Sequence, residues 1–425
     1  MEKRVGVMHF VLMGTHLIKS SSHGKSRVLR DMLIYLLKSF EWRLRLSVID
    51  PLNRIREFFF ILAFRKRCCK FFPSLRKYYS ESEPPANLQD QHNAIFTDNY
   101  YLLKPLKLLQ LSDYQLYITS YFGIAFKNFS ILPESIHGQW AKRRKVVFKN
   151  YYQMVMGSWL YAQHGKEGGV EQLNDKEHYL HVHHWFNYYH WLTETIVRLW
   201  VVKEEMSEYT LLLPEGLKEI NFVKQSLEAF GVKKIYWVKE GIPIQVKKLT
   251  LVQNKPYCNH YDPMQMKQIG LFFRDYSTEH PCAHETFGDK IFITRKKAER
   301  RKMVNEEDMK NLLTAFGFRM VALEDYTLLQ EISIMSKAKY LIGMHGAGLT
   351  NMVFMPPGGK VLELHRAIHS SNDMHSDVYW KLASALDHKY YYQFCEPADA
   401  AQNFFEADLL VDKNLFEENL KKFIS

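Results

Sequence analysis

The chain has 425 residues, of which 47% are hydrophobic and 24% charged, so it can bury a sizeable core and is too long for one ordinary domain. Its net charge is +11, but residues 1–80 carry 17 Lys and Arg against 5 Asp and Glu, while the remainder carries 40 basic and 41 acidic residues. A near-neutral body argues against a nucleic-acid binder, which would need a basic surface on its folded domains.

Residues 1–85 are predicted to form a basic, amphipathic helical arm. Between Val28 and Phe64 apolar residues recur at helical spacing with basic residues between them, and Arg65, Lys66 and Arg67 follow directly. Such a pattern is typical of an interfacial anchor, whose apolar face meets acyl chains and whose cations meet an anionic membrane surface. The alternative is an arm that packs on the body or on a partner subunit, and a homodimer is kept open.

Cysteine usage and hydropathy bear on the compartment. The five cysteines lack zinc or disulfide spacing, which indicates a reducing environment. No stretch of about 18 to 20 uninterrupted apolar residues occurs, so we expect no membrane-spanning helix. These features predict a cytoplasmic protein that is peripheral on the inner face of the membrane.

The first lobe is predicted to span residues 86–283, close to a polar, proline-containing linker over 80–93. Alternation over 178–185 predicts a strand, and the segment 187–200 is predicted to be a helix with Asn187 near its N-cap. The lobe is expected to continue with strands over 209–213, 234–238 and 248–253 and helices over 217–230 and 263–276.

His190 and Glu194 are four residues apart and are expected to share one face of that helix. A carboxylate beside an imidazole can orient a base that takes a proton from a hydroxyl nucleophile. The alternative is a simple hydrogen-bonded pair on a polar helix face. The nearby histidines also raise the question of a metal site, but their spacing matches no standard zinc pattern. They are His178, His181, His183, His184 and His190.

The second lobe, residues 284–395, alternates strand and helix and predicts a doubly wound parallel sheet with ligands at the carboxyl ends of its strands. Its expected strands are 290–294, 318–322, 339–342, 361–364 and 390–394, and its expected helices are 305–316, 327–336 and 376–386. Residues 396–425 are expected to form a tail with a short strand and an amphipathic helix that packs back on the first lobe.

A glycine turn follows the strand 339–342 and carries His345 between Gly343 and Gly346, with a short helix expected to open at Ala347 or Gly348. Strand, glycine turn and helix form an arrangement that holds phosphates, because glycines let backbone N–H groups approach an anion and the helix N-terminus is partially positive. Such turns also occur in α/β proteins without any phosphate.

Basic residues emerge from the carboxyl end of the strand 290–294. Arginine forks suit a diphosphate, so Arg295 and one of Arg300 and Arg301 are the expected charge partners. The alternative is a solvated run of charge, because Lys296 belongs to the same segment.

Several motifs agree, in order, with one known family. The motifs include Asn187-Tyr-Tyr-His-Trp-Leu-Thr-Glu194, Ile293-Thr-Arg295, Arg301, Asn305-Glu306, Gln330-Glu-Ile332, Ile342-Gly-Met-His-Gly-Ala-Gly-Leu-Thr-Asn351, Pro357-Gly358 and Val361-Leu-Glu-Leu364. Over about residues 180–365 the chain resembles glycosyltransferase family 61, including its capsular-polysaccharide members. Thr294 departs from that pattern, since serine is common there, and Glu331 gives Gln330 a less typical context.

The resemblance implies an α/β protein of GT-B architecture, in which two Rossmann-like lobes face a cleft. It implies a nucleotide-sugar donor, inversion at the anomeric carbon and no metal or other cofactor. Carried over by position, Arg295 and Arg301 would lie near the donor diphosphate, Glu363 near the nucleotide ribose, and His190 and Glu194 on the acceptor side. The phosphate turn would comprise His345, Gly346, Ala347, Gly348, Leu349, Thr350 and Asn351.

These observations predict an inverting, metal-independent glycosyltransferase that uses a nucleoside-diphosphate sugar, with uridine as the expected nucleoside. Its acceptor is expected to be a glycan or a lipid-linked glycan in surface-polysaccharide synthesis. Fixed arginine, histidine and amide donors would stabilise the leaving diphosphate, and Glu194 or His190 would act as the base. The alternative is a non-catalytic, nucleotide-binding scaffold of a membrane-associated synthase complex.

Overall fold

The computed structural model describes residues 69–70, 78–97, 100–103, 106, 108–119, 123–127, 130–135, 170–240, 242–253, 259–282, 285–368, 376–402 and 406–425. Two compact units divide the chain, Met1–Arg67 and Cys68–Ser425. Most of the predicted arm therefore lies outside the described residues. Where the range 1–85 is described, the prediction of helix is wrong, because Cys69–Lys70 (β1) and Tyr78–Glu81 (β2) are strands.

The sheet of the first lobe is half parallel and half antiparallel. Its main path runs β10-β9-β8-β11-β4-β5-β6, and the neighbours are parallel from β10 to β11 and antiparallel from β11 to β6. Only the parallel half therefore agrees with the predicted Rossmann-like lobe. The strands are Leu108–Ile118 (β4), Gly123–Lys127 (β5), Ser130–Ile131 (β6), Tyr179–His181 (β8), Thr210–Pro214 (β9), Ile235–Val238 (β10) and Ile244–Val252 (β11).

Short elements complete this lobe. Glu171–Gln172 (β7) pairs with β11, β1 pairs with β4, and β2 pairs with Tyr100–Leu103 (β3) in a separate two-stranded sheet. Apolar side chains of its helices pack in one core with those of β8, β9 and β11. The helices and helical turns of the lobe are Asp90–His92 (η2), Pro133–Ser135 (η3), Tyr188–His190 (α6), Trp191–Thr195 (η4), Ile196–Trp200 (α7), Lys203–Glu208 (η5), Glu215–Leu217 (η6) and Asn221–Ala229 (α8).

The second sheet confirms the doubly wound prediction. Its order is β13-β12-β14-β15-β16-β17, and all neighbours are parallel except β16 and β17. Because β13 lies on one side of β12 and β14 on the other, the order reverses between β12 and β14, which is where open α/β sheets bind ligands. The strands are Lys290–Ile293 (β12), Arg319–Val321 (β13), Tyr340–Met344 (β14), Lys360–Arg366 (β15), Lys389–Pro397 (β16) and Leu409–Leu410 (β17).

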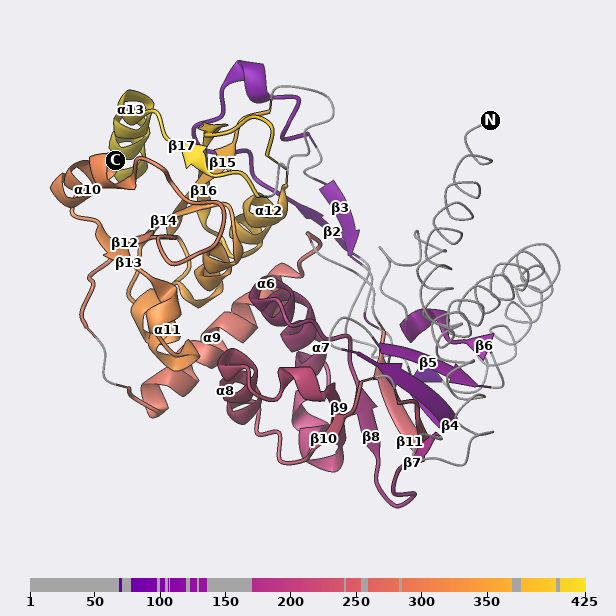
Figure 1. The fold of residues 1–425 in the computed structure, drawn as a ribbon. Coiled ribbons are helices and arrows are strands. Elements are labelled where there is room, and N and C mark those ends of the chain that lie inside the picture. Colours follow the sequence, from indigo (N-terminus) through magenta and orange to yellow (C-terminus); the bar gives the residue numbers. More distant parts are fainter. Residues whose placement is uncertain are drawn as a thin grey trace, which may run out of the picture. The chain divides into compact units, whose positions relative to one another are not determined.

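Helices cover both faces of this sheet (Figure 1). Glu306–Ala315 (α10) and Lys413–Ile424 (α13) pack on the face that carries Phe292, Ile342 and Leu362. The opposite face, with Ile291, Leu341 and Val361, belongs to the core that includes the other helices. These are Leu323–Asp325 (η7), Leu328–Met335 (α11), Ala347–Phe354 (η8) and Val378–Ala385 (α12). Successive side chains of each strand point to opposite faces of the sheet and thus pack in two different cores.

The helix Pro263–Glu279 (α9) joins the two lobes. It begins at Asp262, whose side chain caps the N–H of Gln265 at 3.1 Å. Along its length it contacts α7 of the first lobe and α11, α12 and η8 of the second. A Cβ at Gly270 in this helix would lie 2.3 Å from the carbonyl oxygen of Val353, so glycine permits the close approach of α9 to η8. The apolar core is consequently continuous from one lobe to the other.

The C-terminal tail and the segment near Ala86 both pack on the second sheet. The tail was predicted to pack on the first lobe, and this is wrong, because β17 pairs with β16 and Phe423 of α13 packs against Phe318, Tyr340 and Tyr391. The start of the predicted first lobe also lies along β16, where the N–H of Ala86 donates to the carbonyl of Tyr390 at 2.8 Å. The lobe boundary at residue 86 therefore does not match the packing.

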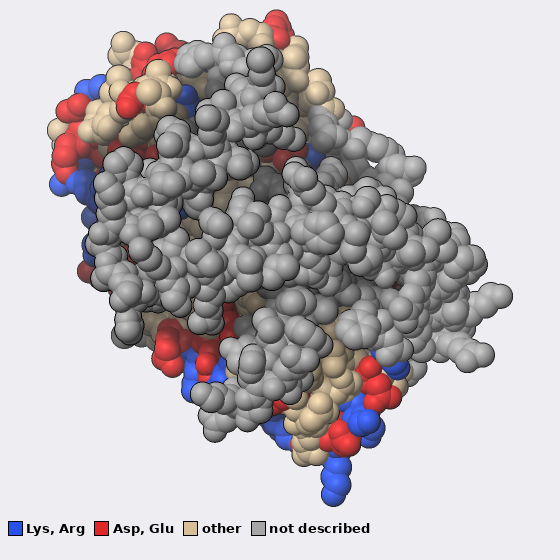
Figure 2. Space-filling model, turned by 45° about the vertical axis from the view of Figure 1, so that its right-hand side comes forward, with Lys and Arg blue, Asp and Glu red and all other residues tan. Residues whose placement is uncertain are grey.

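No described helix is long and apolar enough to cross a membrane. Basic and acidic side chains are interspersed over the described part of the face in Figure 2, as expected for a body of near-zero net charge.

Candidate functional site

The glycine turn lies at the point where the strand order of the second sheet reverses. Ile293 of β12 pairs with Gly343 of β14, so Arg295 and His345 leave the two strands at the same level. Gly346 follows in extended backbone, and a Cβ there would lie 2.6 Å from Arg295 Nη1. Glycine is therefore needed for the close approach of a guanidinium to the turn. The structure thus brings the predicted phosphate turn and the first predicted arginine together.

The loop after β12 folds back so that the guanidinium of Arg295 bonds to the backbone at Arg300 and Arg301. Arg295 donates from Nε to the carbonyl of Arg301 at 3.1 Å and from Nη2 to the carbonyl of Arg300 at 3.3 Å. Arg301 itself has φ 59°, a left-handed conformation that costs a non-glycine residue about 1–2 kcal/mol. At the base of the loop, Thr294 Oγ1 donates to Glu306 at 2.7 Å. Threonine thus keeps a hydroxyl where family members commonly carry serine.

Neither guanidinium has a carboxylate partner within 4.0 Å among the described residues, although both are largely enclosed. Burial lowers the pKa of Arg295, and the charge of Glu324 only partly opposes this. Burial also lowers the pKa of Arg301, and the charge of Arg295 lowers it further. Arg301 Nε is buried without a hydrogen-bond partner in the described structure. Two enclosed cations of this kind indicate a site for an anion.

Arg300 differs from Arg295 and Arg301 in its exposure and in its ion pair. It is 58% exposed and forms an ion pair with Glu406 at 2.7 Å. Arg300 and Arg301 were alternatives for the second charge partner, and the structure encloses Arg301 but leaves Arg300 exposed and paired. Exposed ion pairs contribute little to stability, so Arg300 serves as an internal comparison for its neighbour.

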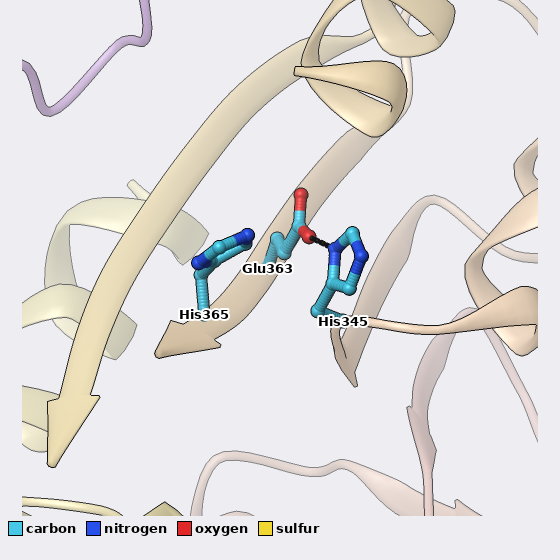
Figure 3. Close-up of side chains that lie close together, drawn as sticks. All are labelled: His345, Glu363 and His365. Atoms are coloured by element: carbon cyan, nitrogen blue, oxygen red, sulfur yellow. Dashed lines mark hydrogen bonds and ion pairs between the residues drawn. The ribbon is translucent and has the colours of Figure 1, made fainter. Parts of the chain in front are cut away.

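His345 is held by a buried carboxylate (Figure 3). Its Nδ1 lies 2.5 Å from Glu363 Oε1, and the hydroxyl of Tyr390 donates to Glu363 Oε2 at 2.8 Å. Burial alone would raise the pKa of Glu363, but the charge and hydrogen bond of His345, the charge of His365 and the hydrogen bond of Tyr390 lower it overall. Glu363 is therefore ionised at neutral pH and orients the imidazole, whose Nε2 is left for a ligand.

The group His345, Glu363 and His365 offers three potential metal-ligand atoms within 4.8 Å of one another. Zinc holds its ligand atoms about 2.0–2.2 Å from the ion, which places two tetrahedral ligands more than 3 Å apart. The 2.5 Å contact between His345 and Glu363 is instead that of a charge-assisted hydrogen bond with a proton between the atoms. The second oxygen of Glu363 is occupied by Tyr390. The three residues do not fit a metal ion in this arrangement.

The helix η8 opens at Ala347, as expected, but the side chains of its next residues point into the protein. Leu349, Thr350 and Asn351 are each at most 1% exposed. These side chains therefore do not reach a bound anion, and the N–H of Leu349 already donates to the carbonyl of Gly346 at 3.0 Å, which leaves the first amides of the helix, at Ala347 and Gly348, for that role. Asn351 has a further contact, since its Oδ1 accepts from the hydroxyl of Tyr188 at 2.9 Å.

On the first lobe, His190 and Glu194 meet as predicted. Asn187 caps the helix by accepting from the N–H of Tyr189 at 3.0 Å, and His190 Nδ1 lies 2.5 Å from Glu194 Oε1. The helix widens to a π-helix over Trp191–Thr195, a feature frequent at functional sites. His190 is 22% exposed and Glu194 only 2% exposed, so His190 alone of the two can reach a substrate.

The pairing leaves Nε2 of His190 as the nitrogen with a lone pair when Nδ1 donates to Glu194. Trp185 stacks on the ring at 4.6 Å with an angle of 20° between the planes, which further restricts its orientation. Glu194 Oε2 also lies 3.9 Å from His183 Nε2. The geometry therefore favours His190 as the base and Glu194 as the residue that orients it, a choice that the sequence left open.

Tyr379 of α12 lies between His345 on the second lobe and Tyr189 on the first, and no pattern in the sequence identified it. Its buried ring is 5.3 Å from His345 and 5.7 Å from Tyr189, which precedes His190. Burial raises the pKa of Tyr379, and the charges of Arg301 and Arg295 act in the opposite direction. A tyrosine in a predicted core helix carries no local signal of such a position, because helical spacing alone does not say which residues meet across lobes.

Comparison with known proteins finds a family match over the part of the chain that contains both groups. Residues 188–362 match the family model described as Glycosyltransferase 61. The chain is 32% identical over 93 residues to the EGF domain-specific O-linked N-acetylglucosamine transferase of Xenopus laevis, covering 21% of this chain and 17% of that protein. It is 33% identical over 81 residues to Protein O-linked-mannose beta-1,4-N-acetylglucosaminyltransferase 2 of Homo sapiens, covering 18% of this chain and 14% of that protein. The alignments thus span less than a fifth of either relative.

Proposed function

Residues 188–362 form a glycosyltransferase family 61 domain, and from this premise we propose that the chain moves a sugar from a nucleoside-diphosphate donor to a glycan or lipid-linked acceptor. One observation supports this most directly. Arg295 and Arg301 are enclosed beside the Gly346 turn with no carboxylate within 4.0 Å among the described residues. A diphosphate would supply the charge that these guanidiniums lack, and arginine forks match its geometry.

Cleavage of the sugar nucleotide needs hydrogen-bond donors that are fixed where negative charge develops. As the bond from the anomeric carbon to the β-phosphate oxygen breaks, its electron pair stays on the leaving diphosphate. Arg295, Arg301, His345 through its Nε2 and the first amides of η8 would stabilise that charge without any metal ion. We assign Glu363 to orienting His345, because both of its oxygens are bonded to protein groups. The ribose contact expected from the family resemblance would require one of those bonds to break.

The acceptor half needs a base. We assign this role to Nε2 of His190, which would take the proton of the acceptor hydroxyl while the oxygen attacks the anomeric carbon from the face opposite the leaving group. This single displacement inverts the anomeric configuration. Glu194 would keep the imidazole in the correct tautomer and stabilise the imidazolium that forms.

We further propose a uridine nucleotide as donor carrier and an acceptor in surface-polysaccharide synthesis. The named relatives are N-acetylglucosamine transferases, which makes UDP-N-acetylglucosamine the first donor to test. Their names refer to protein O-glycans, so O-glycosylated peptides form the second class of acceptor to test beside lipid-linked glycans.

The proposal is tested by a nucleotide panel. The full-length protein is expected to gain thermal stability with UDP and UDP-sugars, because a ligand that binds only the folded state raises its stability. Release of UDP from the matching sugar, with acceptor present and with EDTA added, then measures metal-independent transfer. Stabilisation by nucleotide without any transfer to either acceptor class would favour the non-catalytic scaffold instead.

A membrane role for the arm is a separate proposal. It is supported by the excess of basic over acidic residues in residues 1–80, because anionic surfaces attract such segments. Replacing Arg65, Lys66 and Arg67 with glutamine in the full-length chain is expected to reduce the affinity for phosphatidylserine vesicles, measured by co-sedimentation, about 100-fold, at about 1 kcal/mol per charge. Unchanged co-sedimentation would count against the anchor. A matched triple replacement of Lys218, Lys233 and Lys239 on the body serves as the control.

A further inference from the structure

Two consecutive tyrosines carry the His190 helix into contact with the second lobe. Tyr189 packs against Tyr379, and its hydroxyl lies 2.5 Å from that of Tyr261. Tyr188 reaches η8 and α11, where its hydroxyl lies 2.9 Å from Asn351 Oδ1 and 2.8 Å from Glu331 Oε2. Asn351 lies three residues after Gly348 in the predicted phosphate turn. Tyr188 thus provides a direct side-chain link between the acceptor-side helix and that turn.

Two oxygen atoms lie within hydrogen-bond distance of the single hydroxyl of Tyr188. A tyrosine hydroxyl has one proton, so Tyr188 can donate to only one of its two neighbours. The amide of Asn351 cannot reverse its role, because its Nδ2 donates to the carbonyl of Gly348 at 3.2 Å and its Oδ1 therefore faces Tyr188. If Glu331 were ionised, one close oxygen pair would have no proton between its atoms.

One proton on Glu331 satisfies every group in the chain. The carboxyl O–H then donates to Tyr188, the Tyr188 O–H donates to Asn351, and Asn351 donates to Gly348. We infer that Glu331 is a neutral carboxylic acid that acts through Tyr188 to position Asn351 and the glycine turn for the donor diphosphate. The identity of that ligand rests on the proposed function, whereas the protonation of Glu331 does not.

The electrostatic surroundings agree with a neutral acid. Burial raises the pKa of Glu331 to about 8, hydrogen bonds that Tyr188 and Asn351 would donate to its ionised form oppose this rise, and the charge of Glu324 raises the pKa further. These groups come from α6, η8 and η7 respectively. Ionisation above this pKa would break the donor chain and place a negative charge behind the turn, which would repel a diphosphate.

The raised pKa of Glu331 makes the stability of the folded chain depend on pH. An ordinary glutamate in the unfolded chain ionises near pH 4.5, whereas Glu331 in the folded chain keeps its proton to about pH 8. Between these values the folded state binds the extra proton, so the stability of the wild type falls as the pH rises. Glu331→Gln has no such proton to lose, and its amide N–H can still donate to Tyr188. The variant should therefore gain stability relative to the wild type across this range.

Two measurements on full-length protein test the inference. Tyr188→Phe is expected to weaken UDP binding about tenfold, because it removes a buried donor beside Asn351. Glu331→Gln should bind UDP like the wild type at pH 7 and keep its affinity above pH 8, where the wild type loses affinity. Without nucleotide, the melting temperature of Glu331→Gln relative to the wild type should be higher at pH 9 than at pH 5. Glu418→Gln, an exposed control on α13, should follow the wild type throughout.

The outcomes separate this inference from the proposed function. If Glu331→Gln and the wild type show the same pH dependence of melting, Glu331 is not protonated and the inference is wrong. Wild-type affinity for UDP in Tyr188→Phe would refute the positioning role. If the wild type itself binds no nucleotide, the proposed function and the positioning of a diphosphate turn both fall, while the melting comparison still decides the protonation of Glu331.

Discussion

Replacing His190 with alanine is expected to lower the rate of sugar transfer by about a thousandfold, within the range that general bases contribute. UDP affinity should not change, because His190 lies on the acceptor-side helix. Glu194→Gln should keep the side-chain shape but lose the carboxylate that holds Nδ1 at 2.5 Å, so a smaller loss of about 10- to 100-fold is expected. Rates with saturating donor and acceptor, and UDP affinity by calorimetry, distinguish the two effects.

A matched control for the base is His178→Ala. His178 belongs to the same histidine-rich segment, but its Nε2 lies 2.8 Å from Thr250 Oγ1 and it takes no part in the proposed site. It should retain transfer activity. If Glu194→Gln abolishes transfer while His190→Ala stays active, the roles of the two residues would have to be exchanged.

Replacing Arg295 or Arg301 with alanine is expected to weaken UDP binding by about 10- to 100-fold each, because a hydrogen bond to a charged group contributes about 1.5–3 kcal/mol. Arg300→Ala should bind UDP like the wild type, since Arg300 pairs with Glu406 at the surface. Arg300 is adjacent to Arg301 in the chain, so the comparison controls for changes in the loop itself. Calorimetric titration with UDP measures all three.

The unliganded stability of these variants gives a second check. Each alanine replacement removes one of two enclosed like charges, and the mutual repulsion that lowers the pKa of Arg301 disappears with it. The melting temperature without nucleotide should therefore stay the same or rise, which is the pattern of a site that trades stability for binding. Weaker binding together with a large loss of stability would instead indicate that the arginines are structural.

Among the described residues, the group with metal-ligand spacing is His345, Glu363 and His365, and its geometry does not suit a metal ion. His345 and Glu363 are close enough to share a proton, and Tyr390 occupies the second carboxylate oxygen. The proposed chemistry therefore assigns the charge of the leaving diphosphate to protein groups. Transfer that persists in EDTA would agree with this assignment, whereas activity restored only by added Mn²⁺ would require the His345 side chain to move away from Glu363.

The sequence by itself determined the local elements of the second lobe, because each of them is specified by short-range rules. Short apolar runs predicted β12, β14 and β15, and Gly317 at φ 82° ended α10 where expected. The glycine turn was recognisable because Gly343, Gly346 and Gly348 follow an apolar strand, a pattern that lets backbone N–H groups approach an anion. The spacing of His190 and Glu194 likewise predicted their contact, since residues four apart meet on a helix.

Only the tertiary structure decided which distant residues meet. Tyr188 and Asn351 are 163 positions apart, and nothing in the periodicity around either residue indicates their hydrogen bond. The tail illustrates the same limit: its amphipathic helix was predicted, but an apolar face does not identify the surface that covers it. Burial also distinguishes His190 from Glu194 in a way that their spacing could not, since one side chain reaches solvent and the other does not. Local pattern specifies an element, whereas its partner depends on how the whole chain packs.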